Sequence, residues 1–266
     1  MDIIEAGKRL GMTAKEASDD LRPFSERDPF NGGAPVGGWI SRATDHRYGA
    51  LVITSVDGRP MPSQVVHCTP KIPYPFDRNG IYRFPEADRI VVVDKLDGTN
   101  IFAFSYTAPG GGRRVSFKTR LMPFVGNRAQ GRFLELWQQV LEKYPAIPPT
   151  VLASGLGASF EMYGYRNAHT VLYDVALDAA TLFAVDPASG KLLPPEPKWS
   201  GEGPASRCVV ELAEVGATPE LPPTPAIEAD IRNPHDLQSY YRRMEEEKQV
   251  GLRRIGDGDT FTGSEG

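Results

Sequence analysis

The chain has 266 residues, of which 40% are hydrophobic and 24% charged, and its formal net charge is −4. This length is enough for one large domain, or for one domain with a small appendage, and no segment is long and apolar enough to cross a bilayer. The acidic balance does not indicate a polyanionic partner, so nucleic-acid binding would need a local basic patch.

Residues 1 to about 35 predict a short amphipathic helix followed by a loop rich in Asp, Pro and Gly. After this loop the pattern becomes strand-like, with turn signals at Asp57-Gly58 and Pro109–Gly112. The expected strands are Ala50–Thr54, Gln64–His67, Ile90–Val93, Ile101–Tyr106, Val115–Thr119, Thr150–Ala153, Ala158–Tyr163, Thr170–Val175, Thr181–Val185 and Cys208–Leu212. Ile90–Val93 and Ile101–Tyr106 are expected to form a hairpin.

Helices are few in this pattern. Apolar residues recur at helical spacing from Phe133 to Tyr144, and Pro145 stops the helix. Residues 187–225 are rich in Pro and predict an irregular insertion, and a charged helix is expected at about 234–249. Many antiparallel strands with few helices, rather than alternating βαβ units, indicate an α+β fold.

Cysteine and histidine give little indication of a metal site. The two cysteines, Cys68 and Cys208, lie far apart, which argues against a disulfide framework or a cysteine-rich zinc site. The four histidines lack the spacing of a metal-binding motif, and the N-terminus lacks a signal peptide. A reducing, cytoplasmic location fits best.

The stretch DKLDGTN, residues 94–100, places Lys95 just after a β-branched run. A nucleophilic lysine must lose its proton, and lowering its pKa from about 10.4 to near neutrality costs roughly 4 kcal/mol. Burial at a strand end and neighbouring cations can supply this, and Gly98 would let a nucleotide approach the backbone. In the alternative interpretation, Lys95 is a surface lysine and Asp97-Gly98 an ordinary hairpin turn.

The longer string Lys-x-Asp-Gly-Thr-Asn resembles motif I of the covalent nucleotidyltransferase superfamily, which contains DNA ligases, RNA ligases and mRNA capping enzymes. The form Gly-Thr-Asn is most similar to the phage RNA ligase 2 group. The resemblance implies that Lys95 takes a nucleotide onto Nζ as a phosphoramidate. It also implies that Asp97, Gly98 and Asn100 contact the nucleotide, Asn100 at its ribose or phosphate.

Further blocks follow in the order of this family. Arg120, the last residue of KTR, resembles the arginine of motif Ia and would bind the nucleotide, and Glu161 in FEMYG resembles the motif III glutamate that holds the ribose. Tyr173 in LYDV resembles the motif IIIa aromatic that stacks on adenine, although it can instead be a core residue. Glu265 in SEG resembles the motif IV glutamate that binds the divalent metal. Lys95, Glu161 and Glu265 would thus be the catalytic set.

The resemblance also implies an architecture. It predicts a nucleotidyltransferase (ATP-grasp-like) domain of twisted antiparallel sheets flanked by helices, at residues 61–266 and with the insertion at 187–225. Residues 1–60 would form an N-terminal extension with the first strands. The family's motif V, with its phosphate-binding lysines, should follow motif IV, so we expect the chain to be truncated at motif IV.

The implied activity is ATP-dependent RNA ligation in RNA repair. Lys95 is adenylylated by ATP, the adenylate passes to an RNA 5′-phosphate, and a 3′-hydroxyl displaces AMP. The implied cofactors are ATP and Mg²⁺ or Mn²⁺, the partners are RNA ends, and neither a membrane nor a particular oligomeric state is indicated. The RNA would lie on a basic cluster made of Arg113, Arg114, Lys118, Arg120, Arg128 and Arg132.

Two alternatives remain open. The first is a DNA ligase or a GTP-using capping enzyme, although these usually carry Arg at the position of Asn100. The second is a nucleotide- or RNA-binding module that keeps the pocket but cannot perform the chemistry.

Overall fold

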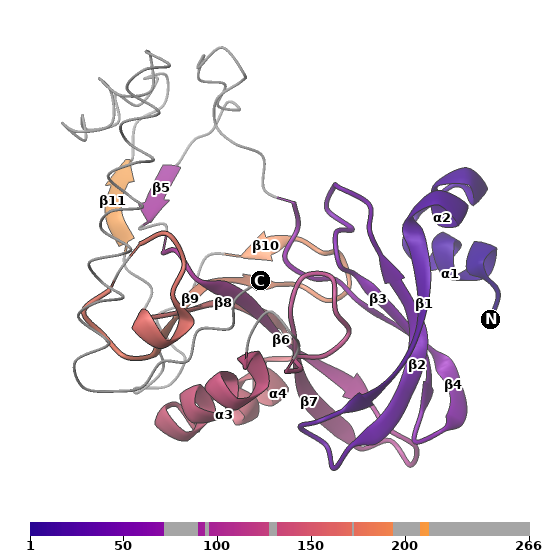
Figure 1. Cartoon of the computed structure of the whole chain (residues 1–266). Coiled ribbons are helices and arrows are strands. Elements are labelled where there is room, and N and C mark those ends of the chain that lie inside the picture. The colour runs from indigo at the N-terminus through magenta and orange to yellow at the C-terminus, as the bar shows by residue number, and fades with distance from the viewer. Residues whose placement is uncertain (72–89, 94–95, 128–131, 172, 194–207, 213–266) are drawn as a thin grey trace, which may run out of the picture. The chain divides into compact units, whose positions relative to one another are not determined.

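The computed structural model describes residues 1–71, 90–93, 96–127, 132–171, 173–193 and 208–212. Over these residues the fold is mixed α+β, with antiparallel sheets and four α-helices, which confirms the predicted class (Figure 1). The chain divides into two compact units. The first contains Met1–Ile72, Gly98–Tyr163 and Leu177–Ser206, and the second contains Pro73–Asp97, Gly164–Ala176 and Arg207–Gly266.

A four-stranded antiparallel meander forms the first sheet of the first unit, and two short helices precede it. Asp57 and Gly58 connect its last two strands with φ angles of 55° and 71°. The predicted turn is confirmed, because a tight hairpin of this kind needs two positive φ values. The elements are α1 (Ile3–Arg9), α2 (Ala14–Asp20), β1 (Leu21–Asp28), β2 (Ala34–Ser41), β3 (Leu51–Val56) and β4 (Arg59–Val66).

The loop predicted in the second half of residues 1–35 was wrong, because β1 occupies part of it. Each residue of β1, from Leu21 to Asp28, has a partner in β2. Only the two end residues of β1 are buried. The strand is therefore stabilised mainly by its pairing with β2, and its apolar contacts are limited to residues such as Leu21 and Phe24. Its sequence consequently lacks the period-two pattern that reveals most strands.

The second sheet of the first unit has the strand order β10-β9-β8-β6-β7, and all its neighbours are antiparallel. The predicted strands in this region are confirmed to within a few residues, apart from the segment that becomes α4. The strands are β6 (Thr99–Thr107), β7 (Arg113–Lys118), β8 (Gly157–Tyr163), β9 (Asp178–Val185) and β10 (Leu192–Leu193).

Strand β6 is buried on both faces and divides the core of the first unit. Ile101 and Ala103 pack in one cluster with residues of α3 (Phe133–Lys143) and α4 (Ile147–Ser154). Phe102 and Phe104 pack in another cluster with residues of the first sheet. Successive side chains of a strand point to opposite faces, so the second sheet lies between the helices and the first sheet (Figure 1).

Helix α3 confirms the predicted helix. Its Trp137 is fully buried, with ring centroids 5.4 Å from Phe117 and 5.6 Å from Phe160. These contacts anchor the helix to β7 and β8. The apolar spacing seen in the sequence is therefore the stripe that faces the sheet.

Helix α4 corrects the prediction of a strand at Thr150–Ala153. A proline lies in its first turn, where a backbone N–H has no partner within the helix. Gly155, with φ of 71°, takes the left-handed conformation that ends it. Only Val151 of this short apolar run is buried, and period alone cannot distinguish such a run from a strand.

In the second unit, β5 (Ile90–Val93) pairs antiparallel with β11 (Cys208–Leu212). The predicted hairpin of Ile90–Val93 with Ile101–Tyr106 was therefore wrong. β11 comes from the Pro-rich region 187–225, so this pairing joins segments that are distant in sequence. The charged helix expected at 234–249 lies outside the described residues.

The strand predicted at Thr170–Val175 was also wrong for its described residues, which form bends after the 3₁₀ turn Tyr165–Asn167. The backbone N–H of Tyr165 donates to the Val175 carbonyl at 2.9 Å, which closes the segment into a loop. The N–H groups of Thr170 and Val171 both donate to one carboxylate, so they are not available to a neighbouring strand. Within the described part of the chain, no helix has the length and apolarity needed to span a membrane.

Candidate nucleotide site

The predicted site residues fall into three groups. Lys95 and Glu265 lie outside the described residues. Gly98, Asn100, Arg120 and Glu161 belong to the first unit, and Asp97 and Tyr173 to the second.

Asn100 and Glu161 are brought together by the pairing of β6 with β8. The register places Asn100 directly opposite Glu161. Side chains that are directly opposite in an antiparallel pair have Cβ atoms about 4.5–5.5 Å apart and lie on the same face of the sheet. The asparagine of the motif I resemblance and the glutamate of the motif III resemblance are thus cross-strand neighbours, although they are distant in sequence.

A chain of buried polar groups holds the Asn100 amide. Its Nδ2 donates to Ser159 Oγ at 2.9 Å and to the Phe160 carbonyl at 3.1 Å. Ser159 Oγ is also 3.0 Å from Thr69 Oγ1, and both of these residues are fully buried. No sequence pattern indicates Thr69 or Ser159, since an isolated hydroxyl residue has no distinctive signature.

The other atom of this amide, Asn100 Oδ1, is buried and has no hydrogen-bond partner among the described residues. A buried acceptor without a donor costs about 1–3 kcal/mol. Such an atom can accept a hydrogen bond from a ligand hydroxyl or amine. The two hydrogen bonds of Nδ2 therefore orient the Asn100 amide and leave Oδ1 as an acceptor for a ligand.

Gly98 lies against the backbone of β8. A Cβ at this position would be 2.2 Å from the Met162 carbonyl oxygen and 3.1 Å from the Tyr163 side chain. The sequence prediction assigned this glycine to the approach of a nucleotide. The close approach within the protein itself already requires glycine here, because even an alanine would collide with main chain.

Asp97 is held by the loop that contains Tyr173. Its Oδ2 accepts from the backbone N–H of Thr170 at 2.6 Å and of Val171 at 2.8 Å. Its own N–H donates to the Tyr173 hydroxyl at 2.7 Å. Three hydrogen bonds thus connect the motif I resemblance to this loop of the second unit, and one of them reaches Tyr173 in the motif IIIa resemblance.

Lys118 does not belong to the basic surface that the sequence predicted. It is fully buried, and its Nζ donates to the carbonyls of Gly49, Thr119 and Arg120, each at 2.9 Å. Burial lowers the pKa of this lysine, while the nearby Cys68 thiol, 3.4 Å from Nζ, opposes the shift. Lys118 therefore holds three backbone carbonyls and is not accessible to RNA. The prediction that it belongs to the basic RNA-binding cluster was wrong.

Arg120 is half-buried at the end of this segment. Its carbonyl accepts from Lys118, and its Nε is buried without a hydrogen-bond partner among the described residues. The remaining described arginines of the basic cluster have local partners. Arg113 binds Ser105 and Leu152, Arg114 pairs with Asp57 at 2.7 Å, and Arg132 pairs with Glu135.

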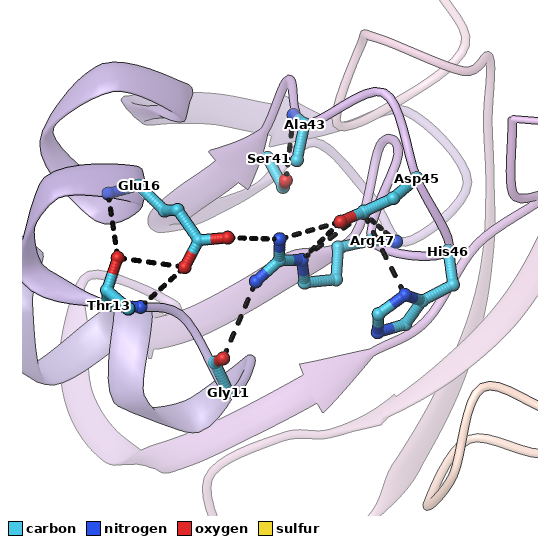
Figure 2. Close-up of polar contacts among 8 residues, drawn as sticks. All are labelled: Gly11, Thr13, Glu16, Ser41, Ala43, Asp45, His46 and Arg47. Atoms are coloured by element: carbon cyan, nitrogen blue, oxygen red, sulfur yellow. Dashed lines mark hydrogen bonds and ion pairs between the residues drawn. The ribbon is translucent and has the colours of Figure 1, made fainter.

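A second polar network lies in the N-terminal region and was not predicted (Figure 2). Arg47, whose side chain is 9% exposed, donates to Asp45 at 2.6 Å and to Glu16 at 2.8 Å. The Arg47 hydrogen bond is the main cause that lowers the pKa of Glu16, to about 2. Glu16 also completes a capping box with Thr13. The network fastens α2 to the segment after β2 and has a structural role.

Metal binding has no support among the described residues, which contain no group of three or more His, Cys, Asp or Glu side chains suited to hold an ion. Glu265, the expected ligand, lies outside them. A scan against models of known protein families finds no match to this chain. A search of curated protein sequences finds no match either. The functional interpretation therefore rests on the sequence motifs and on the geometry above.

Proposed function

We propose that this chain is an ATP-dependent RNA ligase with a nucleotidyltransferase fold, which forms a lysyl-adenylate on Lys95 and seals 5′-phosphate and 3′-hydroxyl RNA ends. The observation that carries the proposal is the register that places Asn100 opposite Glu161. Two blocks chosen only for their sequence resemblance occupy neighbouring positions on adjacent strands. A chance match of either block would not require this.

The polar chemistry at this pair is suited to a nucleoside. Asn100 Oδ1 is buried and unpaired among the described residues, so it can accept from a ribose hydroxyl. Glu161 lies across from it on β8 and already has a contact within the protein, but a carboxylate has about four acceptor sites and so has room for the same sugar. Two acceptors on one face of the sheet match a sugar with two adjacent hydroxyl groups.

The strand pairing speaks against one half of the alternative interpretation, the hairpin turn at Asp97-Gly98. An ordinary hairpin turn would need the strand before it to pair with β6, whereas β5 pairs with β11. The segment around Asp97 is instead held by hydrogen bonds from a loop of the second unit.

In the first chemical step, the lone pair of Lys95 Nζ bonds to the α-phosphorus of ATP, and the bond from that phosphorus to the bridging oxygen of pyrophosphate breaks. The nitrogen gives up a proton to the surrounding water, and pyrophosphate departs. Mg²⁺ or Mn²⁺ would enter with the phosphates of ATP, which is the usual mode of Mg²⁺ binding. The contribution of the chain is to orient the ribose and to place the amine in line.

The test is transfer of label from α-³²P-ATP to the full-length gene product, followed by denaturing gel electrophoresis. We expect acid-labile, alkali-stable label on the wild type and none on Lys95→Ala. Lys15→Ala, which changes an exposed lysine on α2, is the matched control and should label normally. Absence of label from the wild type, or label that persists in Lys95→Ala, would reject the proposal.

Two further arms separate the alternatives. Parallel labelling with α-³²P-GTP distinguishes a capping-type enzyme, and nicked RNA against nicked DNA duplexes distinguishes the two kinds of ligase. ATP that binds tightly without a covalent product would identify a nucleotide-binding module.

A further inference from the structure

Two buried hydroxyl groups lie behind the amide of Asn100. Thr69 follows β4, Ser159 lies on β8, and both residues are fully buried. Their oxygen atoms are 3.0 Å apart, and Ser159 Oγ accepts from Asn100 Nδ2 at 2.9 Å. All three residues belong to the first unit. Thr69 thus reaches Asn100 through one intervening side chain, although neither hydroxyl residue was selected by the motif resemblance.

These contacts decide which end of the Asn100 amide is available. The Phe160 carbonyl oxygen can only accept, so the amide atom 3.1 Å from it is the nitrogen. Ser159 Oγ accepts from the same nitrogen, so both of its N–H groups are engaged. The opposite atom, Oδ1, is buried and lacks a donor among the described residues. A sugar hydroxyl that donates to Oδ1 would therefore satisfy the remaining polar atom of this side chain.

The polar residues on this face of the sheet differ in burial. Ser159 and Glu161 are two residues apart on β8, so they lie on one face, and Asn100 is directly opposite Glu161. Ser159 is fully buried, whereas Asn100 and Glu161 are half-buried. Because Thr69 and Ser159 are fully buried, their effect on a bound nucleotide has to pass through the Asn100 amide.

We propose that Thr69 and Ser159 are positioning residues that make the nucleotide site selective for ribose over deoxyribose, by holding Asn100 Oδ1 towards a sugar hydroxyl. This inference deepens the proposed function and rests on its nucleotide site. The last torsion of an asparagine side chain is broad when nothing holds it, and two acceptors on one nitrogen remove that freedom. A site arranged to hydrogen-bond a hydroxyl rejects an analogue that lacks it, because its own polar atom is then left unpaired.

The experiment measures equilibrium binding of ATP, 2′-deoxy-ATP and 3′-deoxy-ATP to the full-length gene product by calorimetry. Divalent metal is left out, so that no adenylate forms during the titration. The sugar ratio is the dissociation constant of the more strongly rejected deoxy analogue divided by that of ATP. For the wild type we expect a sugar ratio of about 10, which corresponds to one well-placed hydrogen bond.

Thr69→Val and Ser159→Ala should each lower the sugar ratio to about 3, because the amide loses part of its support. Thr69→Ser keeps the hydroxyl and removes only a methyl group, so it should retain the wild-type ratio. Thr54→Val is the matched control. It makes the same substitution at a half-buried threonine of the first sheet, whose hydroxyl donates to the Gly37 carbonyl, and it should leave the ratio unchanged.

The double variant tests whether Thr69 acts through Ser159. Thr69→Val should change the sugar ratio no further once Ser159 is replaced by alanine, since the two hydroxyls belong to one chain of contacts. Thermal unfolding of each variant is measured in parallel. If Ser159→Ala does not fold, the comparison of Thr69→Val with Thr69→Ser decides the test.

The failures are distinguishable. Affinities that fall equally for all three nucleotides would show a general structural role and overturn the inference, as would a wild type that binds ATP no more tightly than both deoxy analogues. Wild-type protein that takes label from α-³²P-ATP, with an unchanged sugar ratio in Thr69→Val and Ser159→Ala, overturns only the positioning role. A wild type that shows the sugar ratio but takes no label rejects the lysyl-adenylate step and leaves the positioning role standing.

Discussion

A buried carboxylate joins the first sheet to the second, and its removal should be among the most destabilising changes in the first unit. Asp28 is fully buried at the end of β1. Its Oδ2 accepts from the Tyr106 hydroxyl at 2.7 Å and from Asn31 Nδ2 at 2.8 Å. Its Oδ1 accepts from Ser116 Oγ and from the Phe30 N–H, each at 2.9 Å. Four donors, two of them on β6 and β7, thus depend on one side chain.

The cost of Asp28→Ala follows from the donors that it leaves behind. Tyr106 and Ser116 are almost completely buried, so neither hydroxyl can turn to water. Each unsatisfied buried donor costs about 1–3 kcal/mol. The effects are not strictly additive, and we expect a loss of about 3–5 kcal/mol in the free energy of unfolding. This is a large share of the roughly 5–15 kcal/mol that stabilises a typical domain.

The assay is urea-induced unfolding followed by tryptophan fluorescence, with Tyr106→Phe as the matched variant. Tyr106→Phe removes one donor and leaves the carboxylate with three, so it should cost about 1.5–3 kcal/mol. The two changes should be strongly non-additive in the double variant, since they share one hydrogen bond. An Asp28→Ala midpoint within about 0.3 M urea of the wild type would refute this reasoning.

Three other predictions follow from the same kinds of contact. The pKa of Glu16 is lowered from 4.5 to about 2, chiefly by its hydrogen bond with Arg47. Its contribution to stability should therefore be complete above about pH 4.5 and lost as the pH falls towards 2. Thermal unfolding over this pH range checks this, and the dependence should be absent in Glu16→Gln. Gly98→Ala should lower the free energy of unfolding by about 2–4 kcal/mol and slow adenylate formation, because its Cβ would lie 2.2 Å from the Met162 carbonyl oxygen. Urea-induced unfolding at the wild-type midpoint would contradict this collision. Lys118→Met should lower the free energy of unfolding by about 3–5 kcal/mol, because three backbone carbonyls lose their hydrogen-bond donor. A urea midpoint equal to that of the wild type would show that this lysine is dispensable for stability.

Local features of the fold were predictable from the sequence because they depend on nearby residues. The stripe on α3 needs only helical spacing, and the turn at Asp57-Gly58 needs only two residues that tolerate positive φ. The strands β6 and β8 were found from their apolar content alone. The α+β class followed from the order of such segments.

Prediction of the candidate site was more limited. The motif resemblance selected Asn100 and Glu161, and the structure then placed them opposite one another, which no local pattern can do. It could not select Ser159 or Thr69, whose hydroxyls matter only because the fold brings them beside Asn100. The roles of Lys95 and Glu265 stay predictions, since both lie outside the described residues.

By itself, the amino-acid sequence determined α3, the turn at Asp57-Gly58 and the strands with a clear apolar pattern, such as β6 and β8. Tertiary structure alone decided the pairing of β5 with β11, the burial of Lys118 and the capture of two backbone N–H groups by Asp97. The physical reason is that burial and hydrogen-bond partners are properties of segments distant in sequence. A lysine beside a strand has the same local sequence whether its ammonium faces water or three carbonyl oxygens.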